Sequence, residues 1–321
     1  MYIDESWPEP MRVYNERFTK LFGMPAQSAG QMGNTLTLRF SNGNHSFKDS
    51  KYFLNPSRQI FSHLTTYKGL FGIVNSGSMR LYNLDNSNDP NELFSLKGIP
   101  PYEAAATNVK RYVHTFSFCR DDAVAKPEMW VKYGQVVLNF EIANDPLAWE
   151  YYRISPMHYG ECDFVAEYTR LSEEMRQMFP DWEFDPDLES LLSLLAFHKE
   201  KIHQDETEVR LLHVPFLFDR RDAQFDFRVS KVHTGLTKFV ELPLFVENSE
   251  RRQISQAKRH NIVRDDSLPL IKIISIQFGD NEPNFDQAQL TKIRYELEDY
   301  LIAKFGYHIE IKQDLFETGV V

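Results

Sequence analysis

The sequence has few cysteines and no long hydrophobic run, and both absences narrow the class of protein. Its 321 residues include two cysteines, Cys119 and Cys162, without CxxC spacing. The sequence therefore indicates neither a disulfide framework nor a structural zinc site. It contains no run of about 18 apolar residues, and its first ten residues lack the basic-then-apolar order of a signal peptide. We expect a cytoplasmic protein that makes no contact with a membrane.

Internal repeats, low-complexity tracts and long linkers are also absent from the sequence. The formal net charge of −10 argues against nonspecific adhesion to nucleic acid, although a local basic groove would still permit specific recognition. Hydrophobic residues make up 42% of the chain and aromatic residues 14%, with 25 Phe among them. This composition predicts a folded protein with a large core and enough aromatic rings to line a cleft.

Residues 57–92 carry the clearest local pattern. A β-prone run over 60–66 is followed by a short amphipathic helix over 70–76, which Gly77 is expected to end in the left-handed conformation. An extended pattern then resumes. His63 and Thr65 lie at the end of the first strand, where side chains commonly face a ligand cleft.

Apolar periodicity predicts strands and helices along the rest of the chain. After a helix over residues 12–22 and a loop over 23–33, a hairpin pairs residues 36–40 with 45–53. Later strands are expected over 111–119, 136–142, 164–168, 225–232, 236–246, 268–278 and 307–311, and later helices over 102–110, 171–179, 188–203 and 287–304. This order predicts an α+β protein with a mostly antiparallel sheet.

We expect three parts in the chain. Residues 1–56 form an N-terminal extension, residues 57–280 form the core, and residues 281–321 supply a C-terminal helix and strand that complete the core.

Two carboxylates and a guanidinium alternate with apolar residues after residue 205. If a strand begins near Glu206, then Glu206, Glu208 and Arg210 project from one face. The same alternation is typical of a solvated sheet face with cross-strand ion pairs. The pattern alone therefore predicts a charged face and leaves its role open.

Other polar and aromatic residues also permit two interpretations. His63 is either a ligand contact or a structural histidine with satisfied hydrogen bonds. Residues 88–92, Asn-Asp-Pro-Asn-Glu, are either a turn or a functional loop. Met129, Trp130 and Tyr133 belong either to the core or to a cleft wall.

Three further features bear on other possible functions: hydrolysis, metal binding and nucleic-acid binding. Ser117 has no Gly-x-Ser-x-Gly elbow around it, which argues against a hydrolase nucleophile. His198 and His203 lack the spacing that places two metal ligands on one helix face, so we expect them at a helix end. The basic run over 251–260 is typical of a solvated helix face and is also the best candidate for contacting nucleic acid.

A series of short blocks resembles a bacterial family of uncharacterised function, and the resemblance covers residues 57–278. The blocks, in order, are His63-x-Thr65, Asn88-Asp89-Pro90-x-Glu92, Phe116-Ser117-Phe118-Cys119, Met129-Trp130-x-x-Tyr133-Gly134 and Glu206-x-Glu208-x-Arg210.

The same layout is similar to the ADP-ribosyltransferase fold, which has a split, mostly antiparallel sheet core with flanking helices. The resemblance implies NAD as substrate, His63 with Thr65 on the adenosine ribose, Ser117 or Tyr133 beside the nicotinamide, and Glu208 at the reaction centre. The usual Ser-Thr-Ser triplet is absent, and Tyr133 follows a loop. The implied catalytic residues are Glu208, His63 and Tyr133. The implied NAD-binding residues are His63, Thr65, Ser117, Trp130, Glu206 and Arg210, with no metal.

The resemblance implies transfer of ADP-ribose to a macromolecular acceptor, which is RNA, DNA or protein. It further implies a toxin-like effector of bacterial conflict or phage defence, restrained by a cognate antitoxin or inhibitor protein. Two other functions stay open. One is a non-catalytic protein that senses a nucleotide in the same cleft. The other is a metal-dependent nuclease that uses Asp89, Glu92, Glu206 and Glu208.

Overall fold

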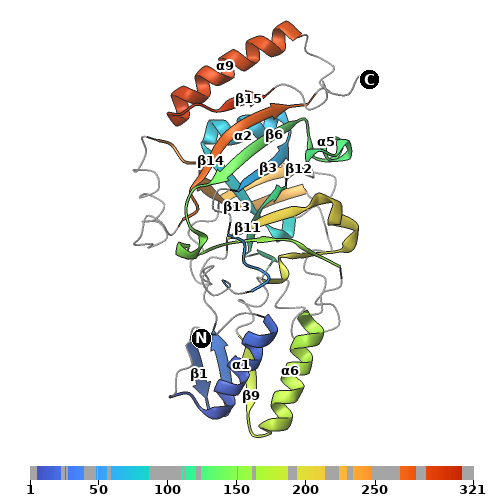
Figure 1. Ribbon diagram of the computed structural model, residues 1–321, viewed down its shortest axis with the longest axis vertical. Coiled ribbons are helices and arrows are strands. Elements are labelled where there is room, and N and C mark those ends of the chain that lie inside the picture. The colour runs from blue at the N-terminus through green and yellow to red at the C-terminus, as the bar shows by residue number, and fades with distance from the viewer. Residues whose placement is uncertain are drawn as a thin grey trace.

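A ten-stranded, mostly antiparallel sheet forms the larger part of the structure (Figure 1). The computed structural model describes residues 6–22, 26, 28–39, 48, 50–55, 59–86, 110–111, 113–120, 124–149, 151–160, 164–186, 194–213, 224–229, 234–247, 268–279 and 287–312. Within them the sheet contains β12 (Gln224–Val229), β13 (Thr234–Pro243), β4 (Ser78–Asn83), β5 (His114–Cys119), β3 (Ile60–Thr65), β6 (Val136–Ile142), β14 (Ile271–Phe278) and β15 (Glu310–Lys312), in that order. β11 (Glu208–His213) pairs with β5, and β7 (Tyr152–Pro156) pairs with β11. The predicted α+β class with mostly antiparallel pairing is confirmed.

The sheet forks at β5. One edge of β5 pairs with β11 along its whole length, from Glu208 opposite Cys119 to His213 opposite His114. The other edge is shared, because β4 pairs with its first two residues and β3 meets it at one position, Ser62 opposite Cys119. Between these contacts, residues 116–118 have no strand partner on this edge within the described sheet. The fork is therefore the place where side chains of β3 and main-chain groups of β5 can meet.

Helix α2 (Tyr67–Ser76) connects β3 to β4, the two strands that diverge at the fork. Its start is capped by Thr66, whose hydroxyl accepts a hydrogen bond from the Gly69 N–H at 3.2 Å. Its end is fixed by Gly77, which has φ of 64° and donates to the carbonyls of Ile73 and Val74. The predicted left-handed end is confirmed, and the helix begins three residues earlier than predicted because of the Thr66 cap.

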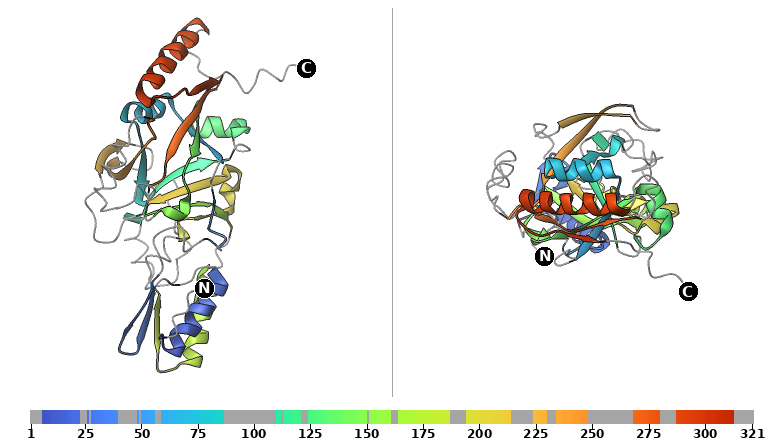
Figure 2. Two further views of the ribbon diagram at one scale, coloured as in Figure 1. Left: turned by 60° about the vertical axis from the view of Figure 1, so that its left-hand side comes forward. Right: turned by 90° about the horizontal axis from the view of Figure 1, so that it is seen from above.

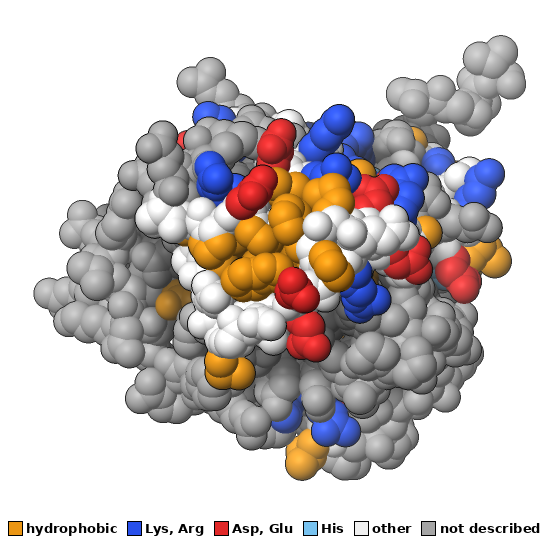
Figure 3. Space-filling view, turned by 90° about the horizontal axis from the view of Figure 1, so that it is seen from below, with side chains coloured by type: hydrophobic (Ala, Val, Ile, Leu, Met, Phe, Trp, Pro, Cys, Tyr) orange, Lys and Arg blue, Asp and Glu red, His pale blue; other side chains and the backbone are white. Residues whose placement is uncertain are grey.

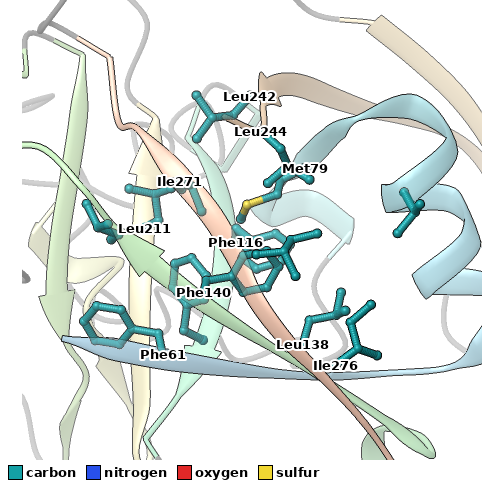
Figure 4. Packing of buried hydrophobic residues seen from close by; sticks show 14 of the residues in the cluster. Phe61, Met79, Phe116, Leu138, Phe140, Leu211, Leu242, Leu244, Ile271 and Ile276 are labelled. Carbon is teal, nitrogen blue, oxygen red and sulfur yellow. The ribbon is translucent and has the colours of Figure 1, made fainter. Parts of the chain in front are cut away.

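The core of the large sheet gathers side chains from eight of its strands. Figure 4 shows part of this cluster. Phe118 and Phe140 meet edge to face with ring centroids 5.7 Å apart. Helix α9 (Gln287–Phe305), predicted almost to the residue, buries Leu297, Leu301 and Phe305 in the same cluster. Besides Phe140, Figure 4 labels these members of the cluster: Phe61, Met79, Phe116, Leu138, Leu211, Leu242, Leu244, Ile271 and Ile276.

A second, smaller unit lies at the other end of the molecule (Figures 1 and 2). Its sheet consists of β1 (Ser28–Met32), β2 (Thr35–Arg39) and β9 (Glu183–Pro186), with α1 (Glu9–Phe22) and α6 (Phe164–Met178) packed against it. β2 pairs antiparallel with β1 and parallel with β9. Helix α1 and strand β2 thus share a core with α6, which includes Tyr14, Phe18, Leu36, Leu171 and Met175.

Several predicted elements are wrong. Residues 28–32, predicted as loop, form β1, and β2 has β1 and β9 on its two edges, so it does not pair with residues 45–53. Residues 164–168, predicted as a strand, begin helix α6. The predicted helix over 188–203 extends too far: residues 194–195 are helical, but residues 196–197 form a turn, 198–199 form a short strand and 201–203 begin a 3₁₀ helix. Residues 188–193 lie outside the described residues. Most of the predicted helix over 102–110 lies outside the described residues.

The surface of the smaller unit carries an open groove and an apolar patch. The groove, of about 440 Å³, lies between α1 and α6, where Arg17 and Glu174 form an ion pair. Figure 3 views the molecule from this end and shows hydrophobic side chains gathered together with charged side chains around them. Every helix in the described residues is too short or too polar to span a membrane.

Gly134 holds helix α5 (Pro127–Tyr133) against the end of β3, and its replacement should be costly. Its φ is 135°, and a Cβ added there would lie 2.3 Å from the Thr65 carbonyl oxygen. We expect Gly134→Ala to lower the free energy of unfolding by more than about 1 kcal/mol, because neither the backbone angle nor the space suits alanine. Urea unfolding would measure the loss. Gly72→Ala is the control: a Cβ at this position in α2 meets no atom within 4 Å, and alanine there should stabilise by up to about 1 kcal/mol. Equal effects of the two substitutions would contradict this account of Gly134.

Candidate active site

Glu208, the first residue of β11, has its carboxylate at the centre of a buried polar network. Only 4% of the residue is exposed. Its Oε1 accepts hydrogen bonds from Ser117 Oγ at 2.5 Å and from Arg210 Nε at 2.8 Å. Its Oε2 lies 2.6 Å from Lys199 Nζ. Burial alone would raise the pKa of Glu208, but the charges of Arg210 and Lys199 outweigh it and hold the pKa at about 2. Glu208 is therefore ionised at neutral pH.

Glu206 forms a second cluster beside Glu208. It is the last residue of the 3₁₀ helix η5 (Lys201–Glu206). Its Oε1 accepts hydrogen bonds from Tyr133 Oη and Lys132 Nζ, both at 2.6 Å, and lies 3.2 Å from His203 Nδ1. Its Oε2 accepts from Lys199 Nζ at 2.8 Å. Burial would raise the pKa of Glu206, yet these cations and hydrogen bonds lower it to about 2. The two carboxylates thus share the ammonium of Lys199.

Thr207 separates the two glutamates and has a left-handed backbone, with φ of 41°. This conformation is uncommon for a β-branched residue. The strand consequently begins at Glu208 and not near Glu206, so the predicted two-residue alternation does not extend to Glu206. The two carboxylates come together through the turn at Thr207.

Ser117 links Glu208 to His63. The Ser117 hydroxyl donates to Glu208, and the Ser117 carbonyl lies 2.9 Å from His63 Nδ1. A carbonyl only accepts, so Nδ1 carries the hydrogen and Nε2 is left as an acceptor. Burial lowers the pKa of His63 to about 4, against the opposing effect of this hydrogen bond, and the ring is neutral at pH 7.

His63 and Glu208 approach β5 from different sides. The His63 ring lies 4.4 Å from the Phe116 ring, centroid to centroid. Neighbouring side chains on a strand point to opposite faces, so Phe116 lies on the face opposite to the Ser117 hydroxyl. The imidazole therefore reaches Ser117 through its main chain at the fork, and the carboxylate reaches it through its side chain.

The aromatic residues of α5 divide between core and site. Trp130 is 6% exposed, its indole N–H donates to the Val124 carbonyl at 2.7 Å, and Gly279 packs against its ring. Trp130 therefore belongs to the core, which is one of the two interpretations that the sequence leaves open. Tyr133 lies on the site side, where burial and Glu206 raise the pKa of its phenol and keep it neutral.

Thr65 lies at the junction of β3, α2 and α5. Its side chain is half-buried beside Gly69, and its carbonyl lies against Gly134. Thr65 is near the fork but lies outside the network of hydrogen bonds that the described residues form around the two glutamates.

The sequence did not predict Lys199 or Tyr159 as site residues. Lys199 belongs to β10 (His198–Lys199), which pairs in parallel with β8 (His158–Tyr159) and places Lys199 level with Tyr159. The Tyr159 hydroxyl accepts a hydrogen bond from the Glu208 N–H at 2.8 Å. The one signal available in the sequence is charge balance, because two buried carboxylates require cations and Arg210 supplies one.

The histidines and acidic residues considered for metal binding do not form a metal site in the described residues. His198 lies on β10 and not at a helix end, with Nε2 3.0 Å from Tyr52 Oη. In the described part of the chain, no group of three or more His, Cys, Asp or Glu side chains could hold a metal ion. Asp89, Glu92, Cys162 and the basic run over 251–260 lie outside the described residues.

Together these features define an α+β protein whose candidate site is a pair of buried, ionised glutamates next to a fork in a mostly antiparallel sheet. No protein-family model, curated protein or solved structure matches the chain.

Proposed function

We propose that the protein is an ADP-ribosyltransferase that moves ADP-ribose from NAD to a macromolecular acceptor, with Glu208 at the reaction centre. The observation that carries the proposal is the chain of contacts from Glu208 through Ser117 to His63 at the fork of the sheet. These three residues come from β11, β5 and β3. They are the residues that the resemblance to this class assigns to the nicotinamide ribose, the nicotinamide and the adenosine ribose.

Glu208 has the charge that this chemistry needs. Breaking the bond between nicotinamide and ribose develops positive charge on the ribose, and a fixed carboxylate stabilises that charge more in the transition state than in the ground state. Glycosidases use carboxylates for the same reason. Arg210 and Lys199 keep Glu208 ionised despite its burial.

His63 and Tyr133 have roles in binding. His63 is neutral, and its Nε2 is an acceptor suited to a ribose hydroxyl. Tyr133 is a neutral phenol next to Glu206 and is suited to frame the nicotinamide. The fork in β5 supports a split core of the ADP-ribosyltransferase type.

The proposal includes the biological role that the class implies. The protein acts in the cytoplasm as a toxin-like effector in bacterial conflict or phage defence, on RNA, DNA or protein, and a cognate antitoxin or inhibitor protein restrains it.

The described geometry favours this function over a metal-dependent nuclease. The oxygens of Glu206 and Glu208 are occupied by Lys199, Arg210 and Lys132, and cations in these positions compete with a divalent metal ion. A nucleotide sensor would use the same residues to bind without turnover, so experiment must separate it from the enzyme.

The function is tested by incubating the protein with NAD labelled in its adenylate half, in the presence of RNA, DNA or cell protein in separate reactions. We expect label on one of these acceptors and release of nicotinamide. His63→Ala should weaken NAD binding about tenfold, the value of one hydrogen bond. His308→Ala, at an exposed residue of the C-terminal segment that pairs with Glu298, is the matched control. NAD binding without nicotinamide release would favour the sensor, and cleavage of nucleic acid that a chelator stops would favour the nuclease.

A further inference from the structure

We propose that Lys199 is a positioning residue of this site, whose ammonium holds Glu206 and Glu208 side by side and fixes the orientation of the Glu208 carboxylate. This inference rests on the proposed function for its catalytic consequence. The arrangement of the two carboxylates around Lys199 can be tested without it.

Lys199 is held in place by its own backbone. It lies on β10, paired with β8, and its carbonyl accepts a hydrogen bond from the Gly160 N–H at 3.1 Å. Its side chain is 11% exposed, and Nζ lies 2.8 Å from Glu206 Oε2 and 2.6 Å from Glu208 Oε2. The ammonium donates a hydrogen bond to Glu206 Oε2 and forms an ion pair with Glu208 Oε2, so one cation compensates both carboxylates. Few alternative orientations are open to a lysine buried in this way.

The division of contacts shows what Lys199 contributes to each glutamate. Glu208 Oε1 is held by Ser117 and Arg210, whereas its Oε2 is held by Lys199. Glu206 Oε1 is held from α5 and η5, whereas its Oε2 is held by Lys199. Loss of the ammonium would leave one oxygen of each carboxylate without this ion pair. The two like charges would then lie close together with less compensation.

The charged and titratable groups around Lys199 come from four elements. η5 supplies Glu206 and His203, β11 supplies Glu208 and Arg210, β8 supplies Tyr159, and α5 supplies Lys132 and Tyr133. Lys132 is half exposed at the edge of the cluster, so Lys199 and Arg210 are the cations buried within it.

The backbone conformation of Thr207 independently supports the arrangement of the two glutamates around Lys199. Thr207 is the one non-glycine residue with positive φ among the described residues. A β-branched residue in this conformation is strained, and such strain clusters at functional sites. Here it turns Glu206 and Glu208 toward the same ammonium, within a segment of ten residues that begins with Lys199.

The proposal predicts a shift in acid stability. Both glutamates have pKa values near 2 in the folded protein and 4.5 ordinarily. Their contribution to stability is therefore complete above pH 4.5 and is lost as the pH falls toward 2. Removing Lys199 raises both folded pKa values. Lys199→Met should then unfold at a higher pH than the wild type, with the acid midpoint raised by about one pH unit.

The experiment compares Lys199→Met and Lys199→Arg with the wild type, and uses Lys292→Met on an exposed ion pair of α9 as the control. Acid unfolding is followed by circular dichroism. Nicotinamide release gives kcat, KM and the acid limb of the pH profile. For Lys199→Met we expect kcat to fall about 10- to 100-fold, KM for NAD to stay within about twofold, and the acid limb to move to higher pH. Lys199→Arg should recover most of both effects, and Lys292→Met should change neither.

The outcomes separate this inference from the proposed function. If the wild type releases no nicotinamide, the proposed function fails, and the acid midpoint alone decides the role of Lys199. An unchanged midpoint in folded Lys199→Met overturns the inference. The inference is also overturned if Lys199→Met lowers stability but leaves kcat and the acid limb of the pH profile unchanged. In that case Lys199 would only support the fold. Lys199→Gln, which keeps a hydrogen-bond donor without charge, supplies the same comparison if the Met variant does not fold.

Discussion

Replacement of Glu208 by Gln is expected to reduce NAD-dependent labelling and nicotinamide release by about 100- to 1,000-fold, the usual effect of removing one group that stabilises charge in a transition state. Gln keeps the shape of the side chain and can still meet Ser117. It removes the negative charge that would face the ribose when the bond to nicotinamide breaks. KM for NAD should change much less than kcat, because that charge matters most in the transition state.

The test requires proof that the variant is folded, because Glu208→Gln leaves Lys199 and Arg210 near a neutral partner. Circular dichroism and urea unfolding at the assay temperature provide this proof. Glu241→Gln is a suitable control, since Glu241 lies on β13 in a partly exposed ion pair with Arg80. Labelling at the wild-type rate by folded Glu208→Gln would show that the catalytic assignment is wrong. Toxicity on expression that Glu208→Gln relieves would support the effector role.

Arg210→Met is expected to be the most destabilising of the substitutions considered, by about 3–5 kcal/mol, because it leaves a buried carboxylate with less compensation. Arg210 is 2% exposed. Its Nε donates to Glu208, and its Nη1 donates to the Ala196 carbonyl at 2.7 Å. Such a loss is a large part of the 5–15 kcal/mol that stabilises a typical domain. Urea unfolding at pH 7 would measure it.

A double substitution separates the ion pair from the packing. Glu208→Met with Arg210→Met removes both buried charges, and we expect it to cost less than the sum of the two single substitutions by at least about 1 kcal/mol. Strict additivity would show that the two side chains do not interact. A loss below about 1 kcal/mol for Arg210→Met alone would contradict the buried network itself.

The elements that could be predicted from the sequence are those whose conformation depends on residues close together in the chain. The end of α2 at Gly77 depends on one residue that tolerates a left-handed backbone, and the hairpin of β12 and β13 depends on adjacent strands. The aromatic and β-branched residues among 164–168 favour a strand by propensity, yet these residues begin α6. Tyr168, Leu171 and Met175 are in fact buried at helical spacing, and packing against α1 decides the outcome.

The site was predictable where sequence neighbours create it. Glu208 and Arg210 are two residues apart on a strand, so their contact follows from the alternation of side chains. Lys199 was missed because leucine periodicity over 188–203 predicts a helix. The chain instead pairs residues 198–199 with residues 158–159, a contact between distant segments that local pattern cannot predict.

Because β2 pairs with β9, a strand from much later in the chain, the smaller unit cannot complete its fold until β9 has been synthesised. Thr35 lies opposite Glu183, 148 residues later in the chain. At the usual speed of translation, the ribosome needs roughly 7 to 30 s to cover that distance. During this time the nascent α1 and the β1–β2 hairpin expose the apolar faces that α6 and β9 will later cover, and a chaperone near the exit tunnel would find its binding surface there.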